Sequence, residues 1–455
     1  MDILEPIVRH LTYPAYLRRD GIHVQPYLSQ LLDSQYWSEQ RLLDHQLGKL
    51  QELSSYVYET SPFYRRRFDE AGLHPSDIDS TDDIAALPIL TKNDIRDAGN
   101  SLFSQGFNKN NTVHKRTGGS TSVPLHIYMD REAYNFKAAA TLRHDAWAGL
   151  MPGKKTAAIW GDTDKQQPLK TRIRNFLSSR AIYLDTLAMT EERLERFTRQ
   201  IHDRRPSILI GHANSIYMFA SYIKSRSVVD IRFEGIITTA MVLHAGERSE
   251  IESTFNSPVF NRYGCEELSV IASESSAHSG LHVLSEGLFI EPLGQNPERP
   301  GEIIITDLVN KAMPLIRYQI GDRAVDAVGK CVSEIGLPRI AQISGRTADF
   351  LYRPDGTPVF GISILDTFVI HIVGIRQAQI VQRSLTELEV RIVKSAAFAS
   401  DTVAQIRTAI DKVFGSQMRM RIEYVDVIQQ TERGKYRFSI CEIEGTLPKV
   451  PPGTE

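Results

Sequence analysis

Apolar residues recur at helical spacing in the first hundred residues of the chain. Within residues 36–60, leucines follow one another at intervals that fit one helical face, at Leu42, Leu43, Leu47, Leu50 and Leu53. This spacing predicts an amphipathic helix. A shorter helix is predicted within residues 61–79, because a capping serine and a proline open it and a glycine ends it.

Short apolar runs alternate with amphipathic stretches between about residues 155 and 265. Strands are predicted at TAAIWG, SILIGH, EGIITTA and PVFNRYG, and helices at TEERLERFTRQIHDRRP, NSIYMFASYIKS and GERSEIESTF. In the first of these helices Leu194, Phe197 and Ile201 share one face. The alternation predicts a parallel sheet covered by helices, which binds ligands at the carboxyl ends of its strands. YGCEE follows the strand PVFNR and is therefore a predicted site loop.

The pattern changes after residue 345. Two strands around a turn are predicted at 378–395, and a further strand at 418–428. Between them, residues 401–414 place Val403, Ile406 and Ile410 on the inward face of a helix. The fold class is therefore α/β, with a large domain over residues 1–345 and a small α+β domain over residues 346–455.

Composition narrows the class of protein. The 455 residues are 42% hydrophobic and 24% charged with a net charge of -2, which predicts a globular enzyme and excludes the basic footprint of a nucleic-acid binder. We expect no membrane span and no signal peptide, since the apolar runs are short and charges and prolines interrupt the N-terminus. Three distant cysteines, Cys265, Cys331 and Cys441, favour a reducing cytoplasm over a disulfide framework.

An unbroken run of small residues, Thr-Gly-Gly-Ser-Thr-Ser, occupies positions 117–122. Its backbone N–H groups are unobstructed, so it is a candidate loop for cradling phosphate oxygens. It is not a Walker A loop, because the Gly-Lys-Ser/Thr ending is missing. Taken alone, such a run is more often a surface connection.

Five motifs in order carry a resemblance to a known family: RTGGSTSVP, NRYGCEE, TDLVNKAMPLIRYQIGD, SGRTADF and TERGKYRF. Together they resemble the signature motifs of adenylate-forming enzymes, and most closely those of the phenylacetate–CoA ligase and CapK-like branch. Residues 61–96 also resemble the N-terminal segment of that branch. The resemblance covers nearly the whole chain and implies a large adenylate-forming domain followed by a small mobile domain.

The resemblance implies an AMP-forming ligase. Such enzymes join a carboxylate to ATP, release pyrophosphate and hold an acyl-adenylate, with coenzyme A as the most expected acceptor. An AMP leaving group makes the unreactive carboxylate reactive. The protein has to position the reactants and neutralise charge on the α-phosphate.

The resemblance also implies roles for individual residues. The phosphate loop would be Thr117, Gly118, Gly119, Ser120 and Thr121. Tyr263, followed by Gly264, would stack on adenine, and Glu267 would hold Mg²⁺. Asp322 would accept hydrogen bonds from the ribose hydroxyls.

Three implied roles fall later in the chain. Arg346 would lie near the ribose or phosphates, Asp349 would lie at the hinge, and Lys435 would be the mobile catalytic lysine. Each assignment has a simpler alternative when taken alone. Tyr263 would then be core packing, the carboxylates would be solvated, Arg346 would pair with one of them, and the segment around Lys435 would be a basic turn.

Candidates for the lining of the acyl pocket are Trp160, His212, Met241 and His244. They suggest an aromatic or medium-sized carboxylate, although aromatic residues at these places are also typical of a core. The partners implied are this carboxylate, ATP and an acceptor supplied by another molecule. The oligomeric state stays open, with a homodimer as one option.

The chain departs from the family at a zinc site that many CapK-like members carry. Ser275 and Ser333 stand at two cysteine positions, while His278, His282 and Cys331 remain. A serine hydroxyl is a poor zinc ligand, so we predict no structural zinc and expect hydrogen bonds or apolar packing in that region.

Two further departures bear on efficiency. Ser122 replaces a glycine of the phosphate loop, at a cost of about 1 kcal/mol if the position needs positive φ. Met241 stands where relatives often have glutamate.

Two functions other than a CoA ligase stay open. The adenylate is passed to an amine or hydroxyl in polysaccharide or secondary-metabolite tailoring, or the chain is a non-catalytic nucleotide-binding relative.

Overall fold

A computed structural model describes most of the chain. The described residues are 2, 4–116, 125–160, 180–185, 189–296, 300–329, 333–344, 351–356, 358–359, 372–429 and 439–443. They form two compact units. The first comprises Met1–Leu243, Glu250–Ile320 and Ala324–Gln342. The second comprises His244–Ser249, Gly321–Arg323 and Ile343–Glu455. The domain boundary expected between residues 345 and 346 stays a prediction.

The first unit begins with helices and a hairpin. Its helices are α1 (Leu4–Ile7), the π-helical turn η1 (Val8–Thr12), α2 (Tyr13–Arg19), α3 (Gln25–Ser34), α4 (Glu39–Thr60), α5 (Pro62–Ala71), α6 (Lys92–Ala98) and α7 (Arg131–Trp147). Short 3-10 turns are η2 (Pro75–Asp77), η3 (Thr81–Ala86) and η4 (Gly99–Leu102). Strands β1 (Val113–Arg116) and β2 (His126–Met129) pair antiparallel before α7.

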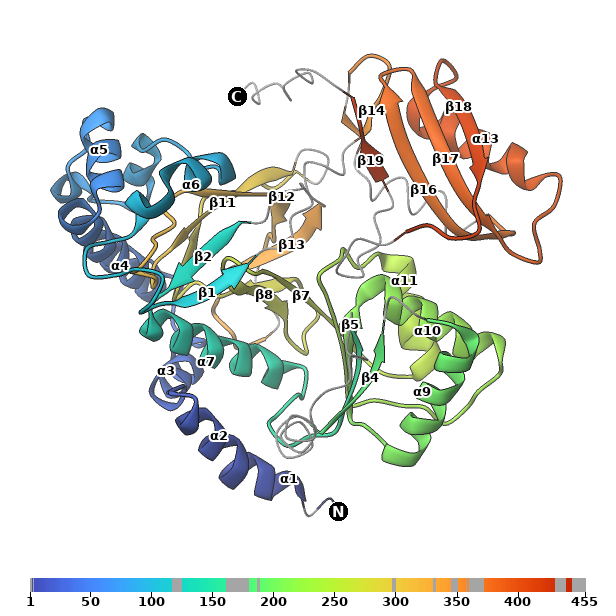
Figure 1. Ribbon diagram of the computed structural model, residues 1–455, viewed down its shortest axis with the longest axis horizontal. Coiled ribbons are helices and arrows are strands. Elements are labelled where there is room, and N and C mark those ends of the chain that lie inside the picture. Colours follow the sequence, from blue (N-terminus) through green and yellow to red (C-terminus); the bar gives the residue numbers. More distant parts are fainter. Residues whose placement is uncertain are drawn as a thin grey trace. The chain divides into compact units, whose positions relative to one another are not determined.

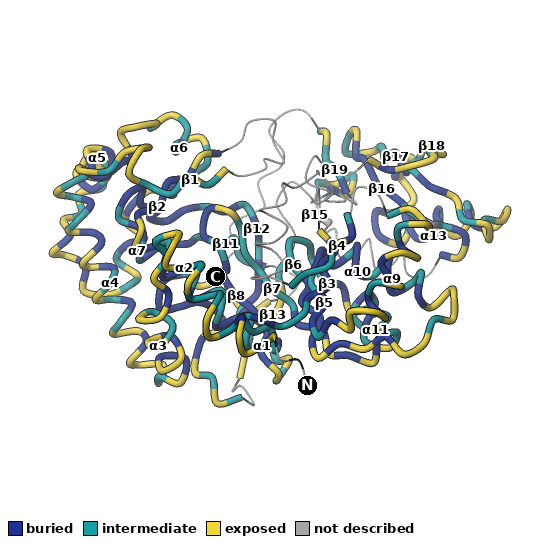
Figure 2. The backbone as a smooth tube through the Cα atoms, turned by 60° about the horizontal axis from the view of Figure 1, so that its bottom comes forward, coloured by how far each residue is buried: buried dark blue, intermediate teal, exposed yellow. Residues whose placement is uncertain are grey.

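The two N-terminal helices predicted from periodicity and caps are confirmed as α4 and α5. Leu42, Leu50 and Leu53 are buried, but Leu43 is 42% exposed and lies on the outer face. Figure 2 shows this alternation of buried and exposed positions along α3 and α4. The Ser61 hydroxyl caps α5 by accepting from the Tyr64 N–H, and Gly72 ends it in the left-handed region at φ 65°.

One sheet lies mainly in the first unit, and only residues 321–323 of β12 and 343–344 of β13 are assigned to the second unit. Its strand order is β10-β11-β12-β13-β9-β8-β7-β6-β5-β3-β4. The strands are β3 (Thr156–Trp160), β4 (Ala181–Asp185), β5 (Ile208–His212), β6 (Gly235–Thr239), β7 (Val259–Cys265), β8 (Ser269–Glu274), β9 (Leu281–Val283), β10 (Leu288–Ile290), β11 (Gly301–Asp307), β12 (Tyr318–Asp326) and β13 (Arg339–Ser344). The predicted parallel sheet is confirmed from β4 to β7, and β7 then pairs antiparallel with β8.

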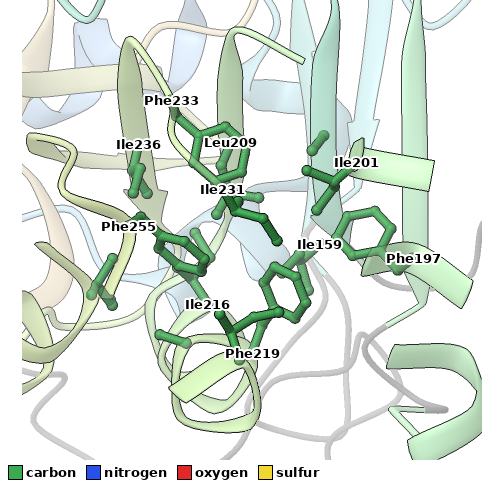
Figure 3. Close-up of a cluster of buried hydrophobic side chains, with 14 of the residues drawn as sticks. Ile159, Phe197, Ile201, Leu209, Ile216, Phe219, Ile231, Phe233, Ile236 and Phe255 are labelled. Atoms are coloured by element: carbon green, nitrogen blue, oxygen red, sulfur yellow. The ribbon is translucent and has the colours of Figure 1, made fainter. Parts of the chain in front are cut away.

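Both faces of the inner parallel strands β3, β5 and β6 are largely buried, as such sheets require, whereas Tyr183 on the edge strand β4 is exposed. One face packs against α9 (Glu191–Arg204), α10 (Ala213–Ser225) and α11 (Ala245–Phe255) in the apolar cluster of Figure 3, while Figure 1 shows α9 and α10 over these strands. Leu209 and Ile236 belong to this cluster. Their neighbours Ile208 and Ile237 face the other side, where they pack with Ala148 at the end of α7.

The second unit contains a four-stranded sheet and one described helix of more than two turns. The sheet order is β18-β17-β16-β19, formed by β16 (Ile375–Ser384), β17 (Glu387–Lys394), β18 (Arg419–Tyr424) and β19 (Ser439–Cys441). Helix α13 (Thr402–Phe414) buries Ile406 and Ile410, as predicted. Strands β14 (Leu351–Tyr352) and β15 (Pro358–Val359) form a separate pair. The α+β character expected here is confirmed.

Within the part of the chain that the structure describes, no helix combines the length and the apolar character needed to cross a bilayer.

Candidate active site

The parallel register aligns the carboxyl ends of neighbouring strands. Trp160 at the end of β3 is level with Asp185 of β4, and His212 at the end of β5 is level with Thr239 of β6. Trp160 and His212 lie against each other, with ring centroids 4.6 Å apart and planes inclined by 47°. His212 is buried, whereas Trp160 is 39% exposed. A large aromatic ring is thus partly exposed at the edge where sheets of this kind bind ligands.

The other two predicted pocket residues come after β6. Met241 follows Ala240, whose φ of 63° turns the chain out of the strand, and its side chain is half-buried. His244 is buried in the second unit, and its backbone N–H donates to the Glu247 carboxylate at 3.2 Å just before α11. The structure therefore brings Trp160 and His212 together, and the lining by all four residues stays a prediction.

The predicted site loop YGCEE, which follows PVFNR at the start of β7, differs from expectation in where it begins. Strand β7 continues through Tyr263 and Gly264 to Cys265, and the turn to β8 consists of residues 266–268. The strand continues because β8 takes over as its pairing partner from Arg262 onward. A Cβ on Gly264 would lie 2.4 Å from the Ser269 carbonyl oxygen, so this tight irregular pairing requires glycine.

Glu267 lies in that turn and is 5% exposed. Its Oε1 accepts a hydrogen bond of 3.0 Å from the hydroxyl of Tyr318, which is fully buried at the start of β12. The alternative of a solvated loop carboxylate is therefore wrong for Glu267. The exposed neighbour Glu266 fits that description instead.

Asp322 lies on β12, four residues after Tyr318. Side chains alternate along a strand, so Tyr318, Ile320 and Asp322 share one face, and all three are buried. Asp322 is therefore no solvated carboxylate either. One strand thus carries both the predicted ribose ligand and the tyrosine that contacts the predicted magnesium ligand.

The start of β12 is fixed by Arg317. This residue has φ 53°, in the left-handed region that disfavours a side chain. Its guanidinium forms a bidentate ion pair with Glu291 at 2.6 and 2.8 Å and also donates to the Ala85 carbonyl at 2.6 Å. These bonds hold the strained backbone in place.

The predicted phosphate loop lies outside the described residues, but the hairpin that bears it is described. Strands β1 and β2 pair from Val113 with Met129 to Arg116 with His126. The buried Asn310 amide donates to the Tyr128 carbonyl at 3.0 Å. The Asp130 carboxylate accepts from the Lys311 N–H and from the Ala133 N–H, each at 2.7 Å. The base of the hairpin is thereby tied to the turn after β11 and to α7.

A buried ion pair supports this turn. Lys137 of α7 lies 2.5 Å from the Asp307 carboxylate at the end of β11, and both side chains are inaccessible to solvent. The other oxygen of Asp307 accepts from the N–H groups of Val309 and Asn310 at 3.2 and 3.4 Å. The sequence motif contained Asp307, Asn310 and Tyr318, but our interpretation gave them no role. The sequence feature that could have identified them is a polar residue within an apolar run.

At the positions of the family's zinc site, the structure shows hydrogen bonds. The Ser275 hydroxyl lies 3.1 Å from Nε2 of His282, and His278 lies 3.5 Å from the Glu274 carboxylate. Burial lowers the pKa of His282 to about 4. Among the described residues, no group of three or more His, Cys, Asp and Glu side chains is arranged to hold a metal ion. The absence of structural zinc stays a prediction, since Cys331 lies outside the described residues.

Several other predicted residues also lie outside the described residues. They are Thr117, Gly118, Gly119, Ser120, Thr121, Ser122, Arg346, Asp349 and Lys435.

Comparison with known proteins identifies relatives over most of the chain. Residues 351–442 match the family model described as the CapK C-terminal domain. Protein CapK of Staphylococcus aureus is 24% identical over 412 residues, covering 89% of this chain and 90% of that protein. The phenylacetate–coenzyme A ligase of Thermus thermophilus is 25% identical over 315 residues, covering 67% of this chain and 70% of the ligase.

Solved structures show the same fold. A crystal structure of 2-hydroxyisobutyryl-CoA ligase in the postadenylation state, in complex with an acyl-AMP, superposes with a TM-score of 0.70. It covers 90% of this chain and 93% of that ligase at 21% identity. The resemblance inferred from the five motifs is therefore confirmed: the homologues of this chain are CapK and the phenylacetate–CoA ligases, and its fold is that of the adenylate-forming acyl-CoA ligases.

Proposed function

We propose that this chain is an AMP-forming ligase that activates a small carboxylic acid with ATP and transfers the acyl group to coenzyme A. The observation that carries the proposal is the burial of Glu267 and Asp322, the two carboxylates that the motifs assign to the nucleotide. Because burying a carboxylate is costly, finding both of these motif carboxylates buried supports a role for them other than that of surface charges. The named CoA ligases among the relatives support the same reaction class.

The reaction has two steps. A carboxylate oxygen of the acid attacks the α-phosphorus of ATP, and the bond to pyrophosphate breaks. The sulfur of coenzyme A then attacks the acyl carbonyl carbon, and AMP leaves with the electron pair of the bond that breaks. In the first step Lys435 would neutralise charge on the α-phosphate, and Asp322 would hold the ribose through its hydroxyl groups.

Glu267 fits a magnesium ion. Carboxylate oxygens are the hard ligands that Mg²⁺ prefers, and among the described residues Oε2 of Glu267 accepts no hydrogen bond while Oε1 is engaged by Tyr318. The bound ion would draw phosphate charge away from the attacking oxygen. Glu267 itself would orient the nucleotide through that ion.

The acid would enter at the carboxyl edge of the parallel strands. Trp160 offers an open aromatic face there, and the buried His212 backs it. This wall suits an aromatic or medium-sized acid, and Met241 would add an apolar surface beside it. In Trp160→Ala, the KM for such an acid should rise while the KM for ATP stays unchanged.

The proposal is tested by carboxylate-dependent exchange of labelled pyrophosphate into ATP, using a panel of aryl and short-chain acids. Lys435→Ala should abolish exchange, whereas Lys412→Ala, which changes an exposed lysine on α13, should not. Glu267→Gln should depress exchange strongly, and Glu266→Gln should leave it near the wild-type rate. Exchange that survives in Lys435→Ala refutes the role of that lysine.

The acceptor is decided separately, by the mass of the product after adding coenzyme A or candidate amines and alcohols. A thioester supports transfer to coenzyme A, while an amide or ester supports tailoring of a sugar or metabolite. ATP binding without exchange on any acid contradicts a catalytic role.

A further inference from the structure

The hydroxyl of Tyr318 has a role that the nucleotide assignments leave unexplained. Its side chain is fully buried, and a buried phenol has to find a hydrogen-bond partner to offset its loss of water. It donates to Oε1 of Glu267, on a turn 51 residues earlier in the chain. The partner is therefore the side chain that we assign to the cation, and the contact joins two different elements.

A second buried tyrosine provides the contrast. Tyr64 on α5 is also fully buried, and its hydroxyl donates to the Pro314 carbonyl at 2.7 Å and accepts from the Ile316 N–H at 3.1 Å. Both of its partners are backbone groups, so its role is to hold the chain before β12. Tyr318 instead contacts a carboxylate.

The backbone of Tyr318 is held on both sides. Leu90 donates its N–H to the Arg317 carbonyl and accepts from the Gln319 N–H, each at 2.9 Å. On the preceding residue, the Arg317 side chain is locked by Glu291. These bonds restrict the backbone of Tyr318 and therefore restrict the position of its hydroxyl group.

The backbone of Glu267 is also constrained, in this case by the short turn between β7 and β8. Its turn closes a hairpin in which Cys265 pairs with Ser269, and Leu268 beside it is fully buried. The hairpin thus fixes the backbone of Glu267, but it does not by itself set the torsions of the Glu267 side chain. The hydrogen bond from the Tyr318 hydroxyl restricts these side-chain torsions.

We propose that Tyr318 is a positioning residue, which holds Oε1 of Glu267 so that Oε2 faces the divalent cation bound to ATP. The inference rests on the proposed function. A phenol suits this task because it is a neutral donor, so it orients the carboxylate without cancelling the negative charge that attracts the cation. An arginine or lysine in its place would compete with the cation for that charge.

The test is Tyr318→Phe, which keeps the ring and removes the hydroxyl. Binding of a non-hydrolysable ATP analogue is measured by calorimetry with Mg²⁺ and with EDTA. We expect the gain in affinity that Mg²⁺ provides to fall about tenfold, the scale of one hydrogen bond to a charged group, and affinity in EDTA to be unchanged. In pyrophosphate exchange, the half-saturating Mg²⁺ concentration should rise about tenfold with the KM for the acid unchanged.

Tyr64→Phe is the matched control, since it removes a buried tyrosine hydroxyl that does not contact Glu267. It should lower the unfolding temperature without changing the Mg²⁺ dependence. Equal Mg²⁺ dependence in Tyr318→Phe and the wild type would overturn the proposal. So would equal shifts in Tyr318→Phe and Tyr64→Phe.

Glu267→Gln separates this proposal from the proposed function. If it removes the Mg²⁺ effect while Tyr318→Phe does not, the positioning role fails and the cation role of Glu267 stands. If Glu267→Gln keeps the Mg²⁺ effect, the cation role itself fails. In the Glu267→Gln background, Tyr318→Phe should have no further effect, because the two changes act through one contact.

If Tyr318→Phe does not fold, 3-fluorotyrosine at position 318 replaces it. Its fluorine resonance should shift when Mg²⁺ and the ATP analogue are added, and should shift much less in Glu267→Gln. Equal shifts in both backgrounds would contradict the proposal.

Discussion

The buried pair of Lys137 and Asp307 offers a quantitative test of how the hairpin below the predicted phosphate loop is held. In Lys137→Met the ammonium is replaced by an apolar chain of similar length. The Asp307 carboxylate then stays buried with its two backbone N–H donors but without a counter-charge. Removing one partner of a buried ion pair costs about 3–5 kcal/mol, a large part of the 5–15 kcal/mol that stabilises a typical domain.

The double variant Lys137→Met/Asp307→Asn removes both charges. Asparagine keeps the Oδ1 acceptor for the N–H groups of Val309 and Asn310. Only the side-chain NH₂ group of the new asparagine, which would face the methionine at position 137, is left without a hydrogen-bond partner. We therefore expect the double variant to lose about 1–2 kcal/mol, less than either single variant. The coupling free energy between the two positions would then be several kcal/mol.

Urea unfolding followed by tryptophan fluorescence measures these losses. All three tryptophans, Trp37, Trp147 and Trp160, belong to the first unit, so the signal reports on the unit that contains the pair. The matched control is Lys224→Met, because Lys224 pairs with Glu250 at 2.9 Å with its side chain 63% exposed, and its loss should leave the unfolding free energy almost unchanged. A loss below about 1 kcal/mol in Lys137→Met, or additive losses in the double variant, would refute the reasoning.

Two further predictions concern a cap and a buried histidine. Ser61→Ala should lower the unfolding free energy by about 1 kcal/mol in the same urea assay, since the Tyr64 N–H loses its capping acceptor, while Ser101→Ala on the exposed surface should not. Burial lowers the pKa of His282 to about 4, so between this value and its ordinary pKa of about 6.5 the unfolded chain binds more protons than the folded one. The contribution of neutral His282 to the free energy of unfolding should therefore be fully present above pH 6.5 and be lost as the pH falls towards 4. His282→Gln should flatten that decline. An unchanged slope would contradict this account. Burial also lowers the pKa of His144, which would account for the part of the slope that remains.

Local patterns were sufficient where one element decides the outcome. Helical spacing identified α4 and α13, and a serine cap with a terminal glycine identified α5. The helical spacing placed Leu43 on the inner face, but in the structure this residue is exposed. Spacing alone does not show how wide a strip of the helix surface is buried. The strand predicted at PVFNRYG ends one residue before β7 does, but the loop predicted at YGCEE begins too early, because the end of β7 depends on pairing with β8, which follows it in the chain.

The amino-acid sequence by itself indicated the class of fold, the alternating elements of the parallel sheet and the family, because periodicity and ordered motifs are local properties that can be recognised without knowledge of any tertiary contact. Tertiary structure alone decided which polar side chains meet. Tyr318 reaches Glu267 across 51 residues, and Lys137 reaches Asp307 across 170. Such pairs depend on the register of strands and on the burial that removes competing water. That burial makes an orienting hydrogen bond or an ion pair strong enough to hold a site.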